Sequence, residues 1–306
     1  MPLSPNLRAA LLMSVAMAAF TVNDVLTKLI AQSMNMGQVM LIRGIMATLL
    51  IGLFAWRWGA FARLRSILHP MIALRVIGET GATICFLAAL QHMPIANISA
   101  VLQVLPLTVT MGAALFLSEP VGWRRWSAIV AGFIGILIII RPGFEGFNAY
   151  ALYGLASVAF ATMRDLTTRR IPSAVPTLLI STATSAAVTL AGAMLVVPYG
   201  GWAPVDGRSL GMLAAAALFL VFGYQFIIQA LRAGDLSFIA PFRYTALLWA
   251  LALGLLVFGD KPDLPMIIGA TIVVCSGLYT LYRERFRGTM KPAAKSTSPS
   301  MTPGGT

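Results

Sequence analysis

The chain of 306 residues is 58% apolar and only 10% charged, whereas soluble globular domains carry about 25% charged residues. A water-soluble fold is therefore excluded for most of the chain. The formal net charge of +12 is spread over short basic clusters between apolar runs, so we expect no nucleic-acid partner, which would require one basic face. Cys85 and Cys275 lie in apolar segments without the spacing of a metal site or a disulfide framework. We expect no metal and no cofactor.

Ten apolar runs follow one another along the chain, each close to the roughly 20 residues that cross a bilayer as a helix. They lack the two-residue alternation of barrel strands, so we predict helices. The first run continues beyond Ala18, where a signal peptide would be cleaved, and reaches Ile30, so we interpret it as a span. The predicted spans are 8–30, 37–57, 71–91, 95–117, 124–141, 149–168, 175–197, 209–231, 236–258 and 264–282.

Lysine and arginine residues gather on one side of these spans. With the N-terminus in the cytoplasm, sixteen of the 22 fall in inner segments and four in outer segments, while Arg43 and Arg243 fall inside spans. The positive-inside rule therefore predicts that both termini are cytoplasmic, in a bacterial inner membrane. Residues 284–306 are rich in Lys, Pro, Ser and Gly, which is typical of a disordered tail.

The sequence resembles itself at an offset of 141 residues. We therefore predict two homologous halves of five spans each, residues 8–141 and 149–283. Because five is odd, the second half enters the membrane from the opposite side. Inverted repeats of this kind are typical of alternating-access transporters, whose solute site lies near the midplane. The offset aligns Asp24 with Asp165, Thr27 with Thr168, Lys28 with Arg169, Ala89-Leu90 with Ala230-Leu231, and Glu119 with Asp260.

Six segments carry a further pattern: FTVNDVLTK (20–28), LIRG (41–44), PIANISAVLQVLPLTVTMGAALFLSEP (94–120), AGFIGILIIIRP (131–142), GDLSFIAPFRYTALLWALALGLLVFGD (234–260) and GATIVVCSGLYTLYR (269–283). Over residues 8–283 the chain resembles tandem EamA domains of the drug/metabolite transporter superfamily. The resemblance implies a basket of ten helices around a central cavity, lined mainly by the first, third, fourth, sixth, eighth and ninth spans. Arg164 and Asp165 depart from the family, in which this part of the sixth span is often apolar or small.

Four ionisable residues lie deep in the predicted spans: Asp24, Arg43, Glu79 and Arg243. Each needs a partner or a water-lined cavity, because a charge at the bilayer centre costs about 2.5–3.5 kcal/mol. By depth, we expect Asp24 to pair with Arg43 and Glu79 to pair with Arg243. Such pairs are either gates that break and reform or fixed links between helices. Glu79 is also a candidate for proton coupling, against facilitated diffusion or exchange.

Uncharged polar residues in the spans are candidates for the wall of the solute cavity. Pro106 and Pro241 interrupt the fourth span of each half, and paired breaks of this kind point to a transporter's binding site, although a purely structural kink is the alternative. A proline also leaves a carbonyl one turn earlier without its usual donor. The cavity candidates are Asn97, Ser99, Gln103, Tyr224, Gln225, Gln229, Tyr244 and Trp249.

The predicted function is secondary transport of a small organic metabolite. Aromatic rings with amides suit a flat, amphipathic solute such as riboflavin or another vitamin. Export of aromatic amino acids or of drugs is the alternative. A membrane-embedded enzyme is the remote alternative, because the only histidines, His69 and His92, fall at span ends and no HExxH or paired-carboxylate motif is present. We predict lipid as a further partner, while the sequence leaves the oligomeric state open.

Overall fold

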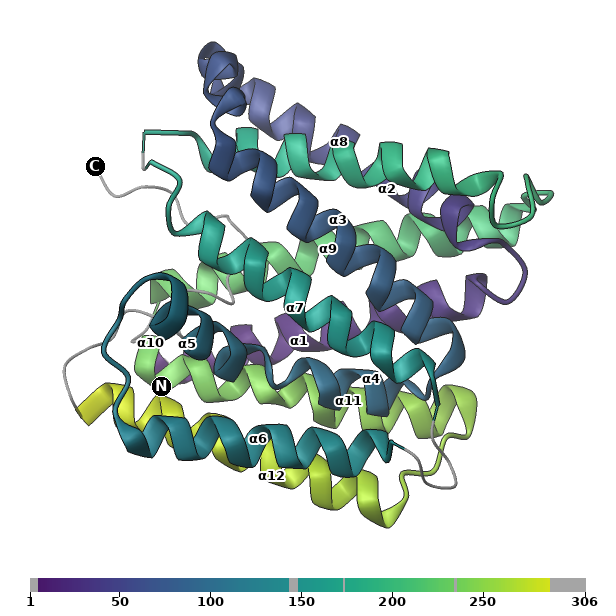
Figure 1. Ribbon diagram of the computed structural model, residues 1–306. Helices are drawn as coiled ribbons and strands as arrows, with labels where there is room; N and C mark the ends of the chain where they lie inside the picture. Colours follow the sequence, from purple (N-terminus) through teal and green to yellow (C-terminus); the bar gives the residue numbers. More distant parts are fainter. Residues whose placement is uncertain (1–4, 143–147, 173, 234–235, 287–306) are drawn as a thin grey trace.

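The protein is a bundle of helices (Figure 1). The computed structural model describes residues 5–142, 148–172, 174–233 and 236–286, and these ranges contain no strand. Nine of the helices within them are long and apolar enough to cross a membrane. The multi-span, all-α class expected from hydropathy is therefore confirmed. Seven of the nine are α1 (Pro5–Ile30), α2 (Met36–Arg57), α3 (Pro70–His92), α6 (Trp123–Ile140), α8 (Thr177–Val196), α9 (Gly207–Ala233) and α12 (Leu264–Phe286), and the other two are the interrupted segments Ile95–Phe116 and Ala240–Phe258. A further long helix is α7 (Tyr150–Thr168).

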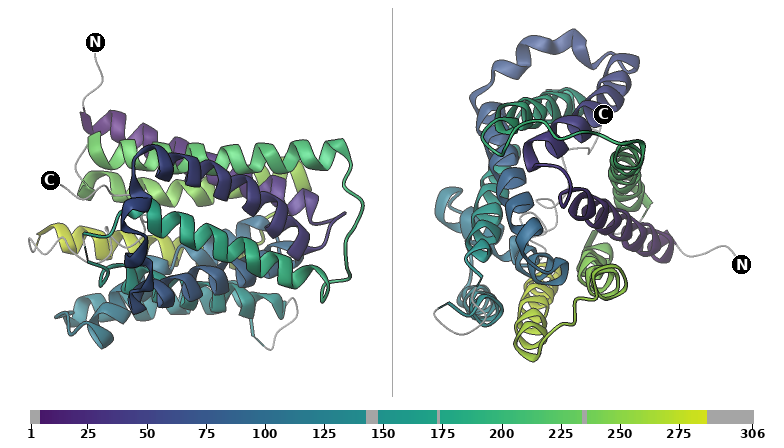
Figure 2. Two further views of the ribbon diagram at one scale, coloured as in Figure 1. Left: turned by 90° about the horizontal axis from the view of Figure 1, so that it is seen from above. Right: turned by 90° about the vertical axis from the view of Figure 1, so that its right-hand side faces the viewer.

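The helix α7 accounts for the tenth predicted span. It is 19 residues long but is not among the nine apolar helices, since Arg164 and Asp165 lie near its end. Helix α1 begins and helix α12 ends at the same end of the bundle (Figure 2), which requires an even number of crossings. A short 3₁₀ helix, η1 (Ala60–Leu68), lies in a segment for which no element was predicted. Residues 287–306 of the predicted tail lie outside the described ranges.

The fourth span of each half is interrupted. In the first half it consists of α4 (Ile95–Leu102) and α5 (Leu105–Phe116), with Pro106 in the first turn of α5. Proline has no N–H to donate, so it fits a first turn, where that group has no helical partner. In the second half it consists of α10 (Leu236–Ile239), η2 (Ala240–Tyr244), α11 (Thr245–Leu253) and the π-helical η3 (Gly254–Phe258), with Pro241 in the first turn of η2.

Side chains cap several helices where the chain enters a span. The Asn35 side chain accepts from the Gln38 N–H at the start of α2, and Asp206 accepts from the Ser209 N–H at the start of α9. Hydrogen bonds from the Ser209 side chain and N–H lower the pKa of Asp206 below its usual value. Such caps satisfy N–H groups that the helix itself leaves unpaired.

The outer surface of the bundle is apolar. Large side chains that a water-soluble protein would bury are exposed here, including Trp56 at 70%, Trp123 at 74%, Met194 at 78% and Leu256 at 79%. A surface of this kind faces lipid, because contiguous apolar patches this extensive are rare on soluble monomers. Membrane lipid is therefore the environment that the helix surfaces fit.

Helices from the two halves pack in pairs: α1 on α9, α2 on α8, α3 on α7, and α6 on α12. The α2–α8 and α6–α12 pairs lie at opposite edges of the bundle (Figures 1 and 2). Glycines permit the closest approach: a Cβ added to Gly135 on α6 would lie 2.8 Å from the Gly269 oxygen on α12. Small residues at helix crossings commonly bring backbones together in membranes.

We expect Gly135→Ala to destabilise the protein, because the added methyl group meets the α12 backbone rather than a flexible side chain. Overpacking of this kind costs about 1–3 kcal/mol. The measurement is the thermal unfolding midpoint in detergent. Gly211→Ala on α9 is the matched control, since a Cβ there enters open space. Equal midpoints for Gly135→Ala and the control would contradict this account of the α6–α12 contact.

Candidate functional site

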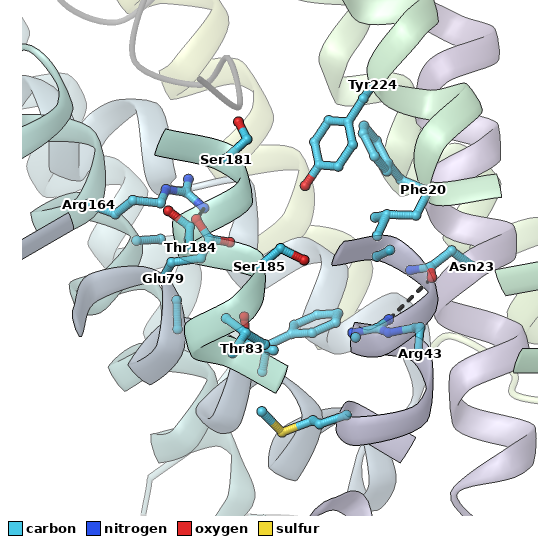
Figure 3. A pocket seen from close by; sticks show the side chains of 18 of the residues that line it. Phe20, Asn23, Arg43, Glu79, Thr83, Arg164, Ser181, Thr184, Ser185 and Tyr224 are labelled. Carbon is cyan, nitrogen blue, oxygen red and sulfur yellow. Dashed lines mark hydrogen bonds and ion pairs between the residues drawn. The ribbon is translucent and has the colours of Figure 1, made fainter. Parts of the chain in front are cut away.

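A cavity of about 380 Å³ lies inside the bundle. Residues from α1, α2, α3, α7, α8 and α9 line it, joined by Leu102 and Leu105 at the break between α4 and α5. Its walls are amphipathic, with aromatic rings, hydroxyl groups and charged side chains (Figure 3). Its volume is near the lower end of the roughly 300–1,000 Å³ typical of small-molecule sites.

One wall combines a charged network with an aromatic pair. Asn23 donates from Nδ2 to Asp24 Oδ1 at 2.9 Å, and Arg43 Nη1 donates to Asn23 Oδ1 at 3.2 Å. Asn23 therefore bridges the two charged residues that were expected to pair directly. The rings of Phe20 and Tyr224 meet edge to face, with their centres 5.2 Å apart, and the Tyr224 hydroxyl points into the cavity (Figure 3).

The opposite wall contains Glu79 on α3. Arg164 Nη1 on α7 donates to Glu79 Oε2 at 3.3 Å, and Arg75 Nη1 lies 3.6 Å from the same oxygen. Arg164 also donates from Nε to Asp165 Oδ1 at 2.7 Å. Two arginines and two carboxylates thus compensate one another in a low-dielectric interior, where an isolated charge is costly.

This arrangement corrects the expected Glu79–Arg243 pair. Depth along the helix suggested Arg243 as the partner, but α3 packs against α7, which brings Arg164 to Glu79 instead. Arg243 lies in η2 and is not among the lining residues of the cavity. Depth alone carries no information about which helices are neighbours.

Four of the residues singled out from the sequence line the cavity: Asp24, Arg43, Glu79 and Tyr224. The structure places the other candidates elsewhere in the bundle. On α4 and α5 Asn97, Ser99, Gln103 and Pro106 are half-buried, Gln225 and Gln229 are exposed on α9, Pro241 is half-buried in η2, Tyr244 is buried, and Trp249 is 40% exposed and donates from Nε1 to the Ser14 carbonyl.

The geometry of α9 explains why Tyr224 and Gln225 separate. Successive residues of an α-helix point about 100° apart, so neighbours in sequence do not share a face. Leu220 and Tyr224, four residues apart, face the cavity, whereas Gln225 and Gln229 form the exposed face. The glutamine pair is regularly spaced, but spacing does not tell which side of the helix is inside.

Hydroxyl groups on α8 form a part of the wall that sequence reasoning missed. Ser181, Thr184 and Ser185 line the cavity, and the Ser185 hydroxyl shares a hydrogen bond of 2.8 Å with Thr48. The offset of 141 residues would have pointed from the candidate Arg43 to Thr184, and it also aligns Met40 and Gly44 of α2 with Ser181 and Ser185. All six members of these pairs line the cavity.

Comparison with known proteins identifies the class of molecule. Residues 7–141 match the EamA-like transporter family. The S-adenosylmethionine uptake transporter of Rickettsia prowazekii is 25% identical over 89% of this chain and 91% of its own length. The pseudopaline exporter CntI of Pseudomonas aeruginosa is 25% identical over 88% and 94%. The riboflavin transporter of Vibrio cholerae is 30% identical over 60% and 61%.

One solved structure has a similar fold. It is the crystal structure of a protein whose sequence is 18% identical to this chain, and the two structures superpose with a TM-score of 0.54. The match covers 91% of this chain and 98% of the other. At this identity the likeness concerns the fold alone.

We expect Glu79→Gln to destabilise the protein strongly, because Arg75 and Arg164 lose their shared carboxylate. Breaking a buried ion pair by removing one partner costs about 3–5 kcal/mol. Thermal unfolding in detergent measures the loss. Asp206→Asn is the matched control, a carboxylate-to-amide change at an exposed cap. Glu79→Asp, which keeps the negative charge on a shorter side chain, should lose less stability than Glu79→Gln, and equal losses would argue against the ion pairs.

Proposed function

We propose that this chain, whose residues 7–141 belong to the EamA-like transporter family, is a secondary transporter of a small organic metabolite and not an enzyme. The observation that supports this most directly is the polar, charged cavity inside a bundle whose outer surface is apolar. Charged groups in a membrane interior mark solute or ion pathways. The cavity volume of about 380 Å³ suits a metabolite rather than a peptide or a polymer.

The proposed architecture is two inverted repeats, residues 8–141 and 149–283. The helix pairs support it: exchanging the halves turns the α1–α9 contact into the α7–α3 contact and leaves the α2–α8 and α6–α12 contacts unchanged. The cavity supports it too, because several lining residues are related by the same offset of 141. These aligned lining pairs are Phe20 with Ala161, Asn23 with Arg164, Ala47 with Val188, Glu79 with Leu220, and Thr83 with Tyr224.

The first solute class that we propose is a flat, amphipathic molecule such as riboflavin. Phe20, Tyr224 and Phe86 present aromatic surface to the cavity, and hydroxyls such as Ser185 present hydrogen-bonding groups. Rings stack on such surfaces while polar groups fix their orientation. Relatives named as riboflavin transporters occur in Rhizobium johnstonii and Vibrio cholerae.

A zwitterionic solute with an amino-acid head group is the second candidate. Arg43 offers a guanidinium to a carboxylate and Asp24 offers a carboxylate to an ammonium group, and Asn23 holds both residues on the same wall. The relatives named for S-adenosylmethionine and pseudopaline match over more of the chain than the riboflavin transporters do. Export of aromatic amino acids belongs to this class. Cationic drugs fit less well beside three lining arginines, Arg43, Arg75 and Arg164.

We further propose that the chain lies in a bacterial inner membrane with both termini in the cytoplasm, as the distribution of Lys and Arg favours. Protons are a candidate coupling ion. Asp24 is then a better carrier than Glu79, because a neutral amide binds the carboxylate of Asp24 while two arginines hold that of Glu79. If collapsing the pH gradient does not change the rate of transport, protons are not the coupling ion.

Purified protein in lipid vesicles should take up or release at least one member of a labelled panel of riboflavin, S-adenosylmethionine and aromatic amino acids. Empty vesicles serve as the control, and the assay is run with and without a pH gradient. We expect saturable flux that needs the intact cavity. A panel without any saturable flux in either direction would count against this choice of solutes.

Two variants distinguish the solute classes. Tyr224→Ala removes a ring from the cavity and should weaken binding of a flat solute roughly tenfold, whereas Gln225→Ala, one residue away on the exposed face, should leave it unchanged. Arg43→Gln should weaken a carboxylate-bearing solute by tenfold or more and an uncharged one far less. Isothermal titration or competition measures both. Equal effects of Tyr224→Ala and Gln225→Ala would contradict the cavity as the binding site.

A further inference from the structure

Two ion pairs join the halves of the chain at opposite ends of the bundle. Lys28 Nζ lies 4.0 Å from Asp260 Oδ2, which connects the end of α1 to the turn after η3. Arg169 Nη1 lies 3.6 Å from Glu119 Oε1, which connects the end of α7 to the turn after α5. Helices α1 and α7 run in opposite directions (Figure 1), so their ends, and with them the two pairs, lie on opposite sides of the cavity.

The two pairs are equivalent under the internal repeat. An offset of 141 residues converts Lys28 into Arg169 and Glu119 into Asp260. Each pair therefore takes its base from one half and its acid from the other, and exchanging the halves exchanges the pairs. Two unrelated surface salt bridges would not be connected by the offset that also relates the lining of the cavity.

The turns that carry the acids also match. Ser118 and Gly259 precede the acids and both have left-handed backbones, with φ of 55° and 70°. In each turn the N–H of the acid donates to the carbonyl six residues earlier, at 3.2 Å for Glu119 and 3.1 Å for Asp260. A left-handed residue directly after the last helical turn is common at helix ends, and in both turns here the bond spans one residue more than in the usual motif. The same local structure thus presents both carboxylates.

The bases stand one helical turn away from the cavity wall. Lys28 follows the lining residue Asp24 by four residues, and Arg169 follows Asp165, the partner of the lining residue Arg164, by four residues. Four residues advance an α-helix by about 6 Å. Each pair is therefore placed just beyond the solute site, at one of its two ends.

A third ion pair between the halves has no counterpart under the repeat. Arg141 and Asp263 connect the end of α6 to the start of α12, at the same end of the bundle as Lys28. The offset converts Asp263 into Gly122, which carries no charge. This pair has no equivalent at the other end and serves as an internal control.

We propose that Lys28–Asp260 and Arg169–Glu119 are matched latches that close the two ends of the solute cavity and are released alternately. The proposal rests on the proposed transport function. Both pairs are formed in this structure, and opening an end requires breaking the pair there. The side chains are partly buried, at 12–31% exposed, but the charged atoms of each pair stand 4.0 and 3.6 Å apart, beyond hydrogen-bonding distance. Either latch can therefore break in each cycle. Losing one pair should shift the equilibrium between closed and open ends by about fivefold or less.

The test uses a single reporter cysteine in the cavity, Ser185→Cys, with Cys85 and Cys275 replaced by alanine. Its reaction rate with a membrane-impermeant thiol reagent is measured in right-side-out and in inside-out vesicles, without solute. Lys28→Gln should raise the rate from one side severalfold, and Arg169→Gln should raise it from the other side. Arg141→Gln should change neither rate. The exchanged variant Lys28→Asp with Asp260→Lys should return toward the parent rate, and it also serves if Lys28→Gln folds poorly.

The outcomes are distinct. If both latch variants increase labelling from the same side, if neither increases it, or if Arg141→Gln increases it as much, the latch proposal is wrong. A charge exchange that reacts as fast as Lys28→Gln would also overturn it. Because the labelling needs no solute, a failed flux assay would count against the proposed solutes and would leave the latch result readable.

Discussion

Hydrocarbon offers no partner to a backbone amide or to a charge, and this constraint shapes the whole molecule. Backbone groups satisfy one another within helices, and breaks such as the one before Pro106 occur beside protein rather than lipid. Charged side chains are subject to the same restriction. Glu79, Arg164 and Asp165 compensate one another across α3 and α7, and this compensation allows a polar cavity to exist inside an apolar bundle.

The proposed internal repeat relates two sides of the cavity that differ in their chemistry. Asp24 and Asp165 occupy equivalent positions, but Arg43 corresponds to Thr184, and Thr83 corresponds to Tyr224. The helix pairs thus follow the proposed two-fold arrangement, while the residues that face the cavity differ between its two sides. A framework that exchanges its halves can open to either side, whereas the lining determines what is bound.

The helices were predictable because burial in lipid leaves a signal in every turn of the chain. The predicted span 37–57 differs from α2 by a single residue, and even the interruptions near Pro106 and Pro241 were visible. Partners were not predictable: the choice of Arg164 over Arg243 depends on helices that are distant in sequence. Gln225 and Gln229 are exposed because the other side of α9 packs against the neighbouring helices. Hydropathy along one helix contains neither kind of information.

The bridge that Asn23 forms between Asp24 and Arg43 has a consequence for any occupant. It puts opposite charges side by side on one wall, while the facing wall is already neutralised by its own ion pairs. For a solute with a polar head and an apolar body, we therefore expect the head to bind at the first wall, whichever end of the cavity is open. Such a solute would then keep one orientation from its entry to its release.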